Sequence, residues 1–138
     1  VVSAFEFARA LAYEWHNHRD LLSQRVKDGR LELGWRLSYD TYRRGLATIK
    51  DYRDRVFESL DGIDLLITPS ANGEAPEDLT TIGQAHFNRV WTAMHVPGIS
   101  LPLFTGSAGL PIGLQLIGHL GGDEPFLDAA DAVFRALS

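Results

Sequence analysis

The hydrophobic pattern changes its period near residue 60, and this change most constrains how the chain can fold. Before that point apolar residues recur at helical spacing, whereas later ones gather in the short runs IDLLITP, GISLPLF and IGLQLIG. Apolar runs of about four to eight residues bounded by turn residues are typical of buried strands. Helices before and after a few such strands predict an α/β fold, mainly helical over residues 1–60, with strands and covering helices over residues 61–138.

The helices are predicted from apolar spacing and from residues that start or stop helices. They are expected over about residues 4–19, 21–27, 39–60 and 84–94, and from Gly121-Gly122-Asp123 towards the end of the chain. Ser38 is expected to cap the long third helix. The stretch GRLELGW, residues 29–35, contains two glycines and is predicted to be a turn.

Length and composition narrow the function classes. A chain of 138 residues has room for one domain, and we assign residues 1–138 to a single domain. The net charge of −5 argues against a nucleic-acid partner, and the absence of cysteine excludes disulfides and thiolate chemistry. No apolar run approaches the roughly 20 residues of a membrane span. The default expectation is a soluble cytoplasmic protein.

The histidines do not show the spacing of a metal site. His16 and His18 in WHNHRD are two residues apart, which places them about 200° apart around a helix, too far to bind one metal from one face. His86, His95 and His119 lack the i,i+4 pairing that zinc sites use. We therefore expect no metal and no cofactor.

Serine chemistry is not recognisable from the residues either. TGSAG around Ser107 does not match the GxSxG nucleophile elbow, and a nucleophilic serine also needs a neutral base within reach. The two lysines, Lys27 and Lys50, lie in charged helical surroundings where they should stay protonated. From the residues alone, the chain is a soluble α/β domain of unassigned chemistry.

Four blocks in fixed order resemble the C-terminal part of amidase-signature enzymes. They are DLLITPS (64–70), FNRVWTAMHVPGISLP (87–102), GLPIGLQLIG (109–118) and GDEPFLDAA (122–130). The helix-to-strand passage over residues 39–69 fits the same region, so the resemblance covers nearly the whole chain. It implies a mixed sheet of few strands packed with helices, part of a larger α/β/α sandwich. The chain departs from the family at Val90 and Asn72, two positions where proline is common.

The resemblance also implies a mechanism. Amidase-signature enzymes hydrolyse amide C–N bonds with a Ser nucleophile, a bridging Ser and a Lys base, and backbone N–H groups stabilise the oxyanion. Those residues lie upstream of the matched region, and none in this sequence corresponds to them. The chain also opens Val1-Val2-Ser3 without Met. We therefore expect a C-terminal fragment of an amidase acting on linear amides, with no catalytic residue of its own and inactive alone.

Four residues are candidates for lining a substrate pocket. Thr68 ends a predicted strand, where α/β sheets usually place their clefts, and Asn88, Trp91 and Thr92 lie in the following helix. Two of them have a structural alternative to weigh. Trp91 could be a core anchor of its helix, and Asn88 a capping or backbone-satisfying amide.

Three functions remain open. The first is an amidase acting on a small-molecule amide in the full-length protein. The second is a glutaminase subunit of a tRNA-dependent amidotransferase, whose partners would be other subunits. The third is a non-enzymatic interaction module. A Lys followed by a Gly/Ser-rich stretch upstream of Val1 would support the first two, and its absence would leave the third.

The predicted strands also suggest self-association. Three strands are few for a sheet, and strands without neighbours tend to pair with other chains through their edges. We expect a homo-oligomer formed through an exposed sheet edge. Light scattering checks this expectation, and a clean monomer at high concentration would contradict it.

Overall fold

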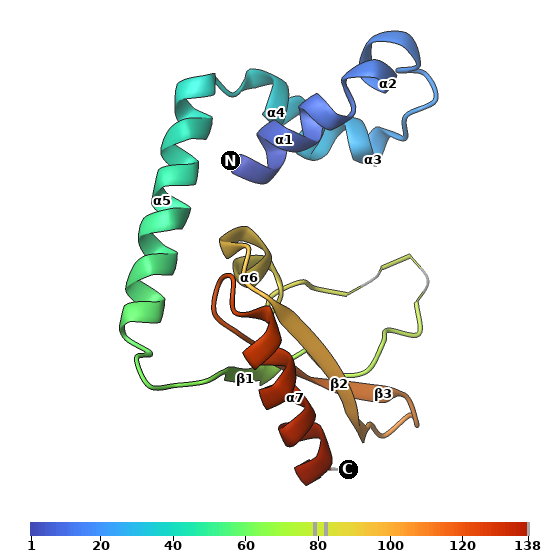
Figure 1. The fold of residues 1–138 in the computed structure, drawn as a ribbon. Coiled ribbons are helices and arrows are strands. Elements are labelled where there is room, and N and C mark those ends of the chain that lie inside the picture. Colours follow the sequence, from blue (N-terminus) through green and yellow to red (C-terminus); the bar gives the residue numbers. More distant parts are fainter. Residues whose placement is uncertain (79, 82, 138) are drawn as a thin grey trace. The chain divides into compact units, whose positions relative to one another are not determined.

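The computed structural model describes residues 1–78, 80–81 and 83–137, which form two compact units (Figure 1). The first unit, residues 1–54, is helical, and the second, residues 55–138, holds three strands and covering helices. The predicted α/β class is confirmed. The single-domain assignment stays a prediction. Among the described residues, no helix is both long and apolar enough to cross a membrane.

The first unit is built from short helices that lead into one long helix. In chain order they are α1 (Val2–Ala10), α2 (Ala12–Asn17), α3 (Gln24–Val26), the π-helical turn η1 (Lys27–Leu31), α4 (Glu32–Arg36) and α5 (Tyr39–Glu58), whose last four residues belong to the second unit. The predicted first helix is interrupted at Leu11, whose φ of −100° and ψ of 22° leave the helical region. The predicted cap of α5 is confirmed, because the Thr41 amide donates to Ser38 Oγ at 3.1 Å.

The predicted turn over residues 29–35 is wrong, because η1 and α4 continue the helix through Gly34. Glycine is needed there for close approach. A Cβ at Gly34 would overlap the carbonyl oxygen of Ala4 and lie 2.7 Å from Cβ of Ala8. The Gly34 carbonyl oxygen accepts a hydrogen bond of 2.6 Å from Arg9 Nη1. Contact between α1 and α4 therefore outweighs the ordinary tendency of glycine to end a helix.

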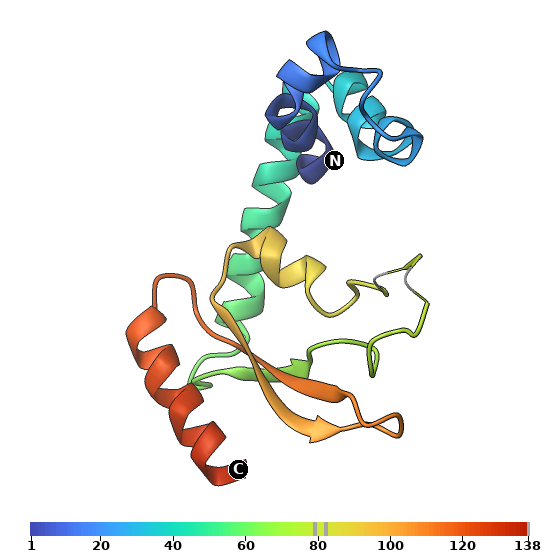
Figure 2. The same ribbon diagram turned by 90° about the vertical axis from the view of Figure 1, so that its right-hand side faces the viewer.

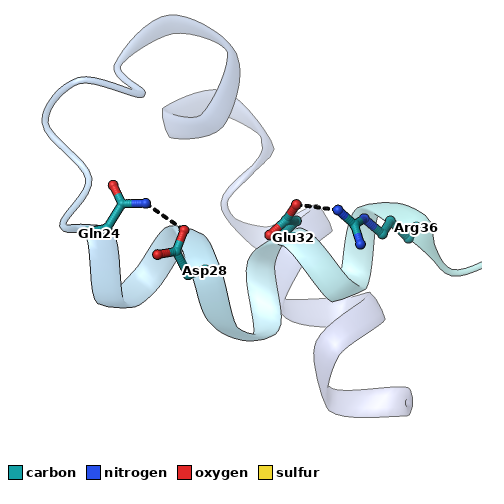
Figure 3. Close-up of polar contacts among 4 residues, drawn as sticks. All are labelled: Gln24, Asp28, Glu32 and Arg36. Carbon is teal, nitrogen blue, oxygen red and sulfur yellow. Dashed lines mark hydrogen bonds and ion pairs between the residues drawn. The ribbon is translucent and has the colours of Figure 1, made fainter.

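Exposed polar pairs support the same helical stretch (Figure 3). Gln24 donates to Asp28, four residues later, and Arg36 pairs with Glu32 one turn before it. Each such i,i+4 pair contributes about 0.2–0.5 kcal/mol to a helix. The two pairs lie on either side of Gly29, whose backbone leaves helical geometry, so they support the turns that flank this kink.

The second unit contains a three-stranded antiparallel sheet. Its strands are β1 (Leu66–Pro69), β2 (Gly98–Thr105) and β3 (Pro111–Ile117), in the order β1-β3-β2. All three lie in the apolar runs that predicted them. Both pairings are antiparallel, so the parallel pairing expected of a mixed sheet does not occur among these strands. Self-association through the outer edges of β1 and β2 stays a prediction.

Helix α7 (Asp123–Leu137) covers one face of this sheet (Figure 1). Its buried residues Phe126 and Ala130 pack with Leu101 of β2 and Leu116 of β3. The core is completed by partly buried neighbours: Leu65, Ile99, Leu103, Leu114 and Val133. Leu127, Phe134 and Leu137 of α7 are exposed.

The other face of the sheet meets the segment that contains α6 (Arg89–Met94) (Figure 2). The predicted helix over residues 84–94 is shorter in the structure. It ends at Met94 because His95 takes a left-handed conformation with φ of 56°, which stops helix propagation before Pro97. The backbone then enters β2 at Gly98.

The packing in the first unit predicts that a leucine-to-alanine substitution has different effects at two neighbouring positions. Leu31→Ala should lower the free energy of unfolding by about 2–5 kcal/mol, because it empties a fully buried site. Leu33→Ala is the matched control, since Leu33 is 49% exposed, and its effect should be within about 0.5 kcal/mol of zero. Urea unfolding followed by circular dichroism measures both. Equal effects would contradict the observed burial.

Candidate functional site

The structure brings together two of the four predicted pocket residues, Thr68 and Asn88. Thr68 lies on β1, and Asn88 immediately precedes α6. Both are half-buried and both contact Gln115 in the middle of β3. Trp91 is half-buried in α6, and Thr92 is exposed with its hydroxyl donating to the Asn88 carbonyl oxygen at 3.0 Å.

A directional series of hydrogen bonds, which we call the amide relay, joins Thr68, Gln115, Asn88 and Ser70. Thr68 Oγ1 donates to Gln115 Oε1 at 3.1 Å, and Gln115 Nε2 donates to Asn88 Oδ1 at 2.6 Å. Asn88 Nδ2 then donates to the Ser70 carbonyl oxygen at 3.1 Å. Each side-chain amide uses its oxygen as acceptor and its nitrogen as donor. The relay therefore fixes the orientation of both amides.

The relay gives Asn88 a structural task outside its own helix. Asn88 occupies the N-cap position of α6, yet its side chain makes no capping hydrogen bond. It satisfies the backbone carbonyl of Ser70 instead, across 18 positions of sequence. Asn88 is thus a backbone-satisfying amide, one of the two structural roles considered from the sequence. The same contact holds the segment after β1 against the start of α6.

Sheet register explains why these polar groups share one face. Gln115 lies opposite Thr68 on β1 and opposite Ser100 on β2. Because strand side chains alternate, Gln115 points away from the face on which Leu114 and Leu116 pack near α7. Gln115 is not predicted as a site residue from the sequence. Its signal was present as the one polar residue inside the apolar run IGLQLIG.

A pair of serine hydroxyls lies beside the relay. Ser70 Oγ and Ser100 Oγ are 2.6 Å apart. Gly113 makes room for them, since a Cβ there would lie 2.6 Å from Ser70 Oγ and would overlap Ser100 Oγ. In the described part of the chain, no lysine or histidine side chain hydrogen-bonds either hydroxyl. The pair lacks the base that a serine nucleophile needs.

A separate hollow of about 490 Å³ lies near the end of β3. Its lining includes Phe57, Asp61, Asp64, His119 and Phe126, and none of the four predicted pocket residues. The His119 ring contacts Phe57 at 4.8 Å between centroids, and its Nε2 lies 2.8 Å from the Ile63 carbonyl oxygen. With Nε2 protonated, His119 donates to that oxygen and ties the chain before β1 to the end of β3.

The acidic and histidine side chains do not gather into a metal site. Over residues 1–78, 80–81 and 83–137, no group of three His, Asp or Glu side chains could hold a metal ion. The candidate site is instead made of neutral hydroxyls and carboxamides. Such groups donate and accept hydrogen bonds without carrying charge, which suits a neutral polar ligand such as an amide.

The sequence matches known proteins over most of its length. The family model described as Amidase matches residues 7–127. A glutamyl-tRNA(Gln) amidotransferase subunit from Parvibaculum lavamentivorans is 33% identical over 109 residues, which is 71% of this chain and 22% of that protein. The mitochondrial counterpart from Mus musculus is 36% identical over 91 residues, which is 59% of this chain and 17% of that protein.

Solved structures share the fold. A crystal structure of an amidase superposes with a TM-score of 0.84 and 26% identity, covering 98% of this chain and 33% of that one. The 6-aminohexanoate cyclic dimer hydrolase superposes with a TM-score of 0.76 and 20% identity, over 97% of this chain and 33% of that chain. The chain thus spans less than a quarter of these two curated relatives and a third of these solved structures.

The amide relay predicts that replacing Gln115 by leucine, a side chain of similar size, destabilises the fold. Gln115→Leu should lower the free energy of unfolding by about 1–3 kcal/mol, because it leaves half-buried polar groups of Thr68 and Asn88 without a partner. Gln84→Leu, at an exposed position, is the matched control and should change it by less than about 0.5 kcal/mol. Urea unfolding measures both variants. A Gln115→Leu chain as stable as the control would show that the relay contributes nothing.

Proposed function

Because this chain belongs to the amidase family, we propose that it forms the C-terminal part of an amide C–N hydrolase whose reacting groups lie outside it. The family match over residues 7–127 carries this proposal. The superposition with an amidase over 98% of the chain supports it independently of sequence identity. The parent protein then acts on an amide, and this chain supplies part of the framework and of the pocket wall.

The proposed chemistry is a Ser-Ser-Lys mechanism. A neutral lysine takes a proton through the bridging serine, so that the second serine attacks the amide carbonyl. The groups in this chain do not supply that arrangement. Lys50 pairs with Asp54, and Lys27 Nζ donates to the Arg19 carbonyl oxygen at 3.5 Å. The pair Ser70 and Ser100 has no lysine among its hydrogen-bond partners.

The proposed pocket wall consists of Thr68, Asn88, Trp91 and Thr92. Asn88, Trp91 and Thr92 are spaced at i, i+3 and i+4, which places them on one side of the first turn of α6. The relay connects that turn to Thr68 on β1. The wall then offers an aromatic surface and neutral hydrogen-bonding groups to an amide substrate. We place the protein in the cytoplasm and expect no nucleic-acid contact by this chain.

A second candidate is the glutaminase subunit of a tRNA-dependent amidotransferase. The names of the curated relatives favour it, since both relatives described above are glutamyl-tRNA(Gln) amidotransferase subunits, with 33% and 36% identity to this chain. The substrate would then be glutamine rather than another amide, and the partners would be other subunits. A comparison of glutamine with small linear amides separates the two candidates.

The proposal predicts that the 138-residue chain is inactive by itself. Purified chain should release no ammonia from glutamine or from small linear carboxamides above the buffer rate, because in the described part of the chain neither Ser70 nor Ser100 has a lysine or histidine among its hydrogen-bond partners. Ammonia release measured with a coupled assay checks this. Turnover that co-purifies with the chain through several columns would overturn the prediction.

A chimera provides the positive control. Residues 1–138 replace the corresponding third of the amidase of known structure, which keeps its own upstream portion. Amide hydrolysis by the chimera, with none by the chain alone, is the expected result. Preference of the chimera for glutamine would favour the second candidate. A folded chimera without any amidase activity would contradict the assignment of this chain to such an enzyme.

A further inference from the structure

Glu74 makes an unusual set of contacts in the segment that follows β1. Its carboxylate accepts hydrogen bonds from the backbone amide of Ala108 at 3.0 and 3.1 Å and from that of Leu110 at 2.9 Å. Ser107 Oγ adds a longer contact of 3.4 Å. These donors all belong to the turn between β2 and β3, more than 30 positions away in sequence. The segment and the turn lie on the same side of the second unit (Figure 2).

The turn is shaped to receive a carboxylate. Its Gly106 amide donates to the Leu110 carbonyl oxygen at 2.9 Å, and its Gly109 amide donates to the Gly106 carbonyl oxygen at 3.1 Å. The amides of Ala108 and Leu110 are therefore the ones directed at Glu74. Gly106 is required for the approach, because a Cβ there would overlap the Glu74 side chain.

The contact is electrostatic without any cationic side chain. Residues 105–111 of the turn carry no titratable group, and the nearby acids on the segment itself are Glu77 and Asp78. The backbone amides of Ala108 and Leu110, in that order, lower the pKa of Glu74 below its ordinary value. Oriented backbone amides favour the ionised carboxylate in the same way in other anion-binding turns.

We propose that Glu74 is a carboxylate latch that holds residues 70–78 closed against the β2–β3 turn and thereby positions Ser70 beside Asn88 and Ser100. Ser70 is four residues before Glu74, and it receives Asn88 Nδ2 on its carbonyl and contacts Ser100 through its hydroxyl. Release of the latch frees one end of this short segment. The latch is a property of the fold, and its effect on a substrate pocket rests on the function proposed above.

The latch depends on pH in a defined direction. A protonated carboxyl keeps one acceptor oxygen but loses the negative charge that the backbone donors favour, so the ionised form holds the segment more strongly. Because the pKa of Glu74 is lowered in the folded chain, the latch is fully closed above the ordinary glutamate range. It opens as the pH falls through the lowered value. The latch is therefore closed at neutral pH.

Hydrogen exchange on the 138-residue chain tests the latch at neutral pH. Glu74→Gln should raise the exchange rates of the Ala108 and Leu110 amides about tenfold. Glu77→Gln, an exposed glutamate in the same segment, is the matched control and should leave both rates unchanged. Unchanged rates in Glu74→Gln would overturn the proposal.

An NMR titration of the unmodified chain keeps the test decisive if Glu74→Gln fails to fold. The amide shifts of Ala108 and Leu110 should follow a single ionisation with a pKa below that of an ordinary glutamate. Shifts that titrate at the ordinary value, or not at all, would contradict the latch. Neither measurement uses amide hydrolysis, so failure of the latch and failure of the proposed enzyme function are distinguishable.

Discussion

The position of β3 between two antiparallel partners is the constraint on which the second unit depends. Each face of this strand has a separate task, because its side chains alternate. Leu114 and Leu116 join the apolar core near α7, whereas Gln115 enters the amide relay on the opposite face. A slip of one residue in register would exchange the two sets, burying an amide against α7 and exposing leucines. Core packing therefore also sets the geometry of the candidate site.

Under the proposed function, this chain contributes structural support and part of the pocket wall, and the reacting groups lie outside it. The reaction class is then amide hydrolysis, and the polar face supplies half-buried carboxamides and hydroxyls held in fixed orientations. Such preorganised neutral groups can position an amide, but bond cleavage needs an activated nucleophile. Two long-range contacts hold the segment after β1. Asn88, just before α6, donates to the Ser70 carbonyl oxygen, and the turn between β2 and β3 donates to the Glu74 carboxylate. Both contacts restrain a loop, whose conformation is not fixed by the hydrogen bonds of a helix or a sheet.

Sequence patterns predicted the parts of the fold that depend on local signals. The apolar runs located all three strands, and Ser38 was identified as a cap because its contact to Thr41 is local. Gly34 was misread because its role depends on α1, far away in sequence. Thr68 and Asn88 are predicted from the sequence as pocket residues, and that role stays a prediction. Gln115 and Glu74 are not predicted from the sequence, since their partners lie 27 to 47 and 33 to 36 positions away. Local pattern carries no information about such contacts.

The geometry of the candidate site depends on the amide relay, which fixes the two side-chain amides on this face of the sheet. Hydrogen exchange of side-chain NH₂ groups, resolved by NMR on the 138-residue chain, tests it directly. If the relay is formed, the amide protons of Gln115 and Asn88 exchange more slowly than those of exposed Gln84 and Asn72. Equal exchange rates at all four side chains would contradict it.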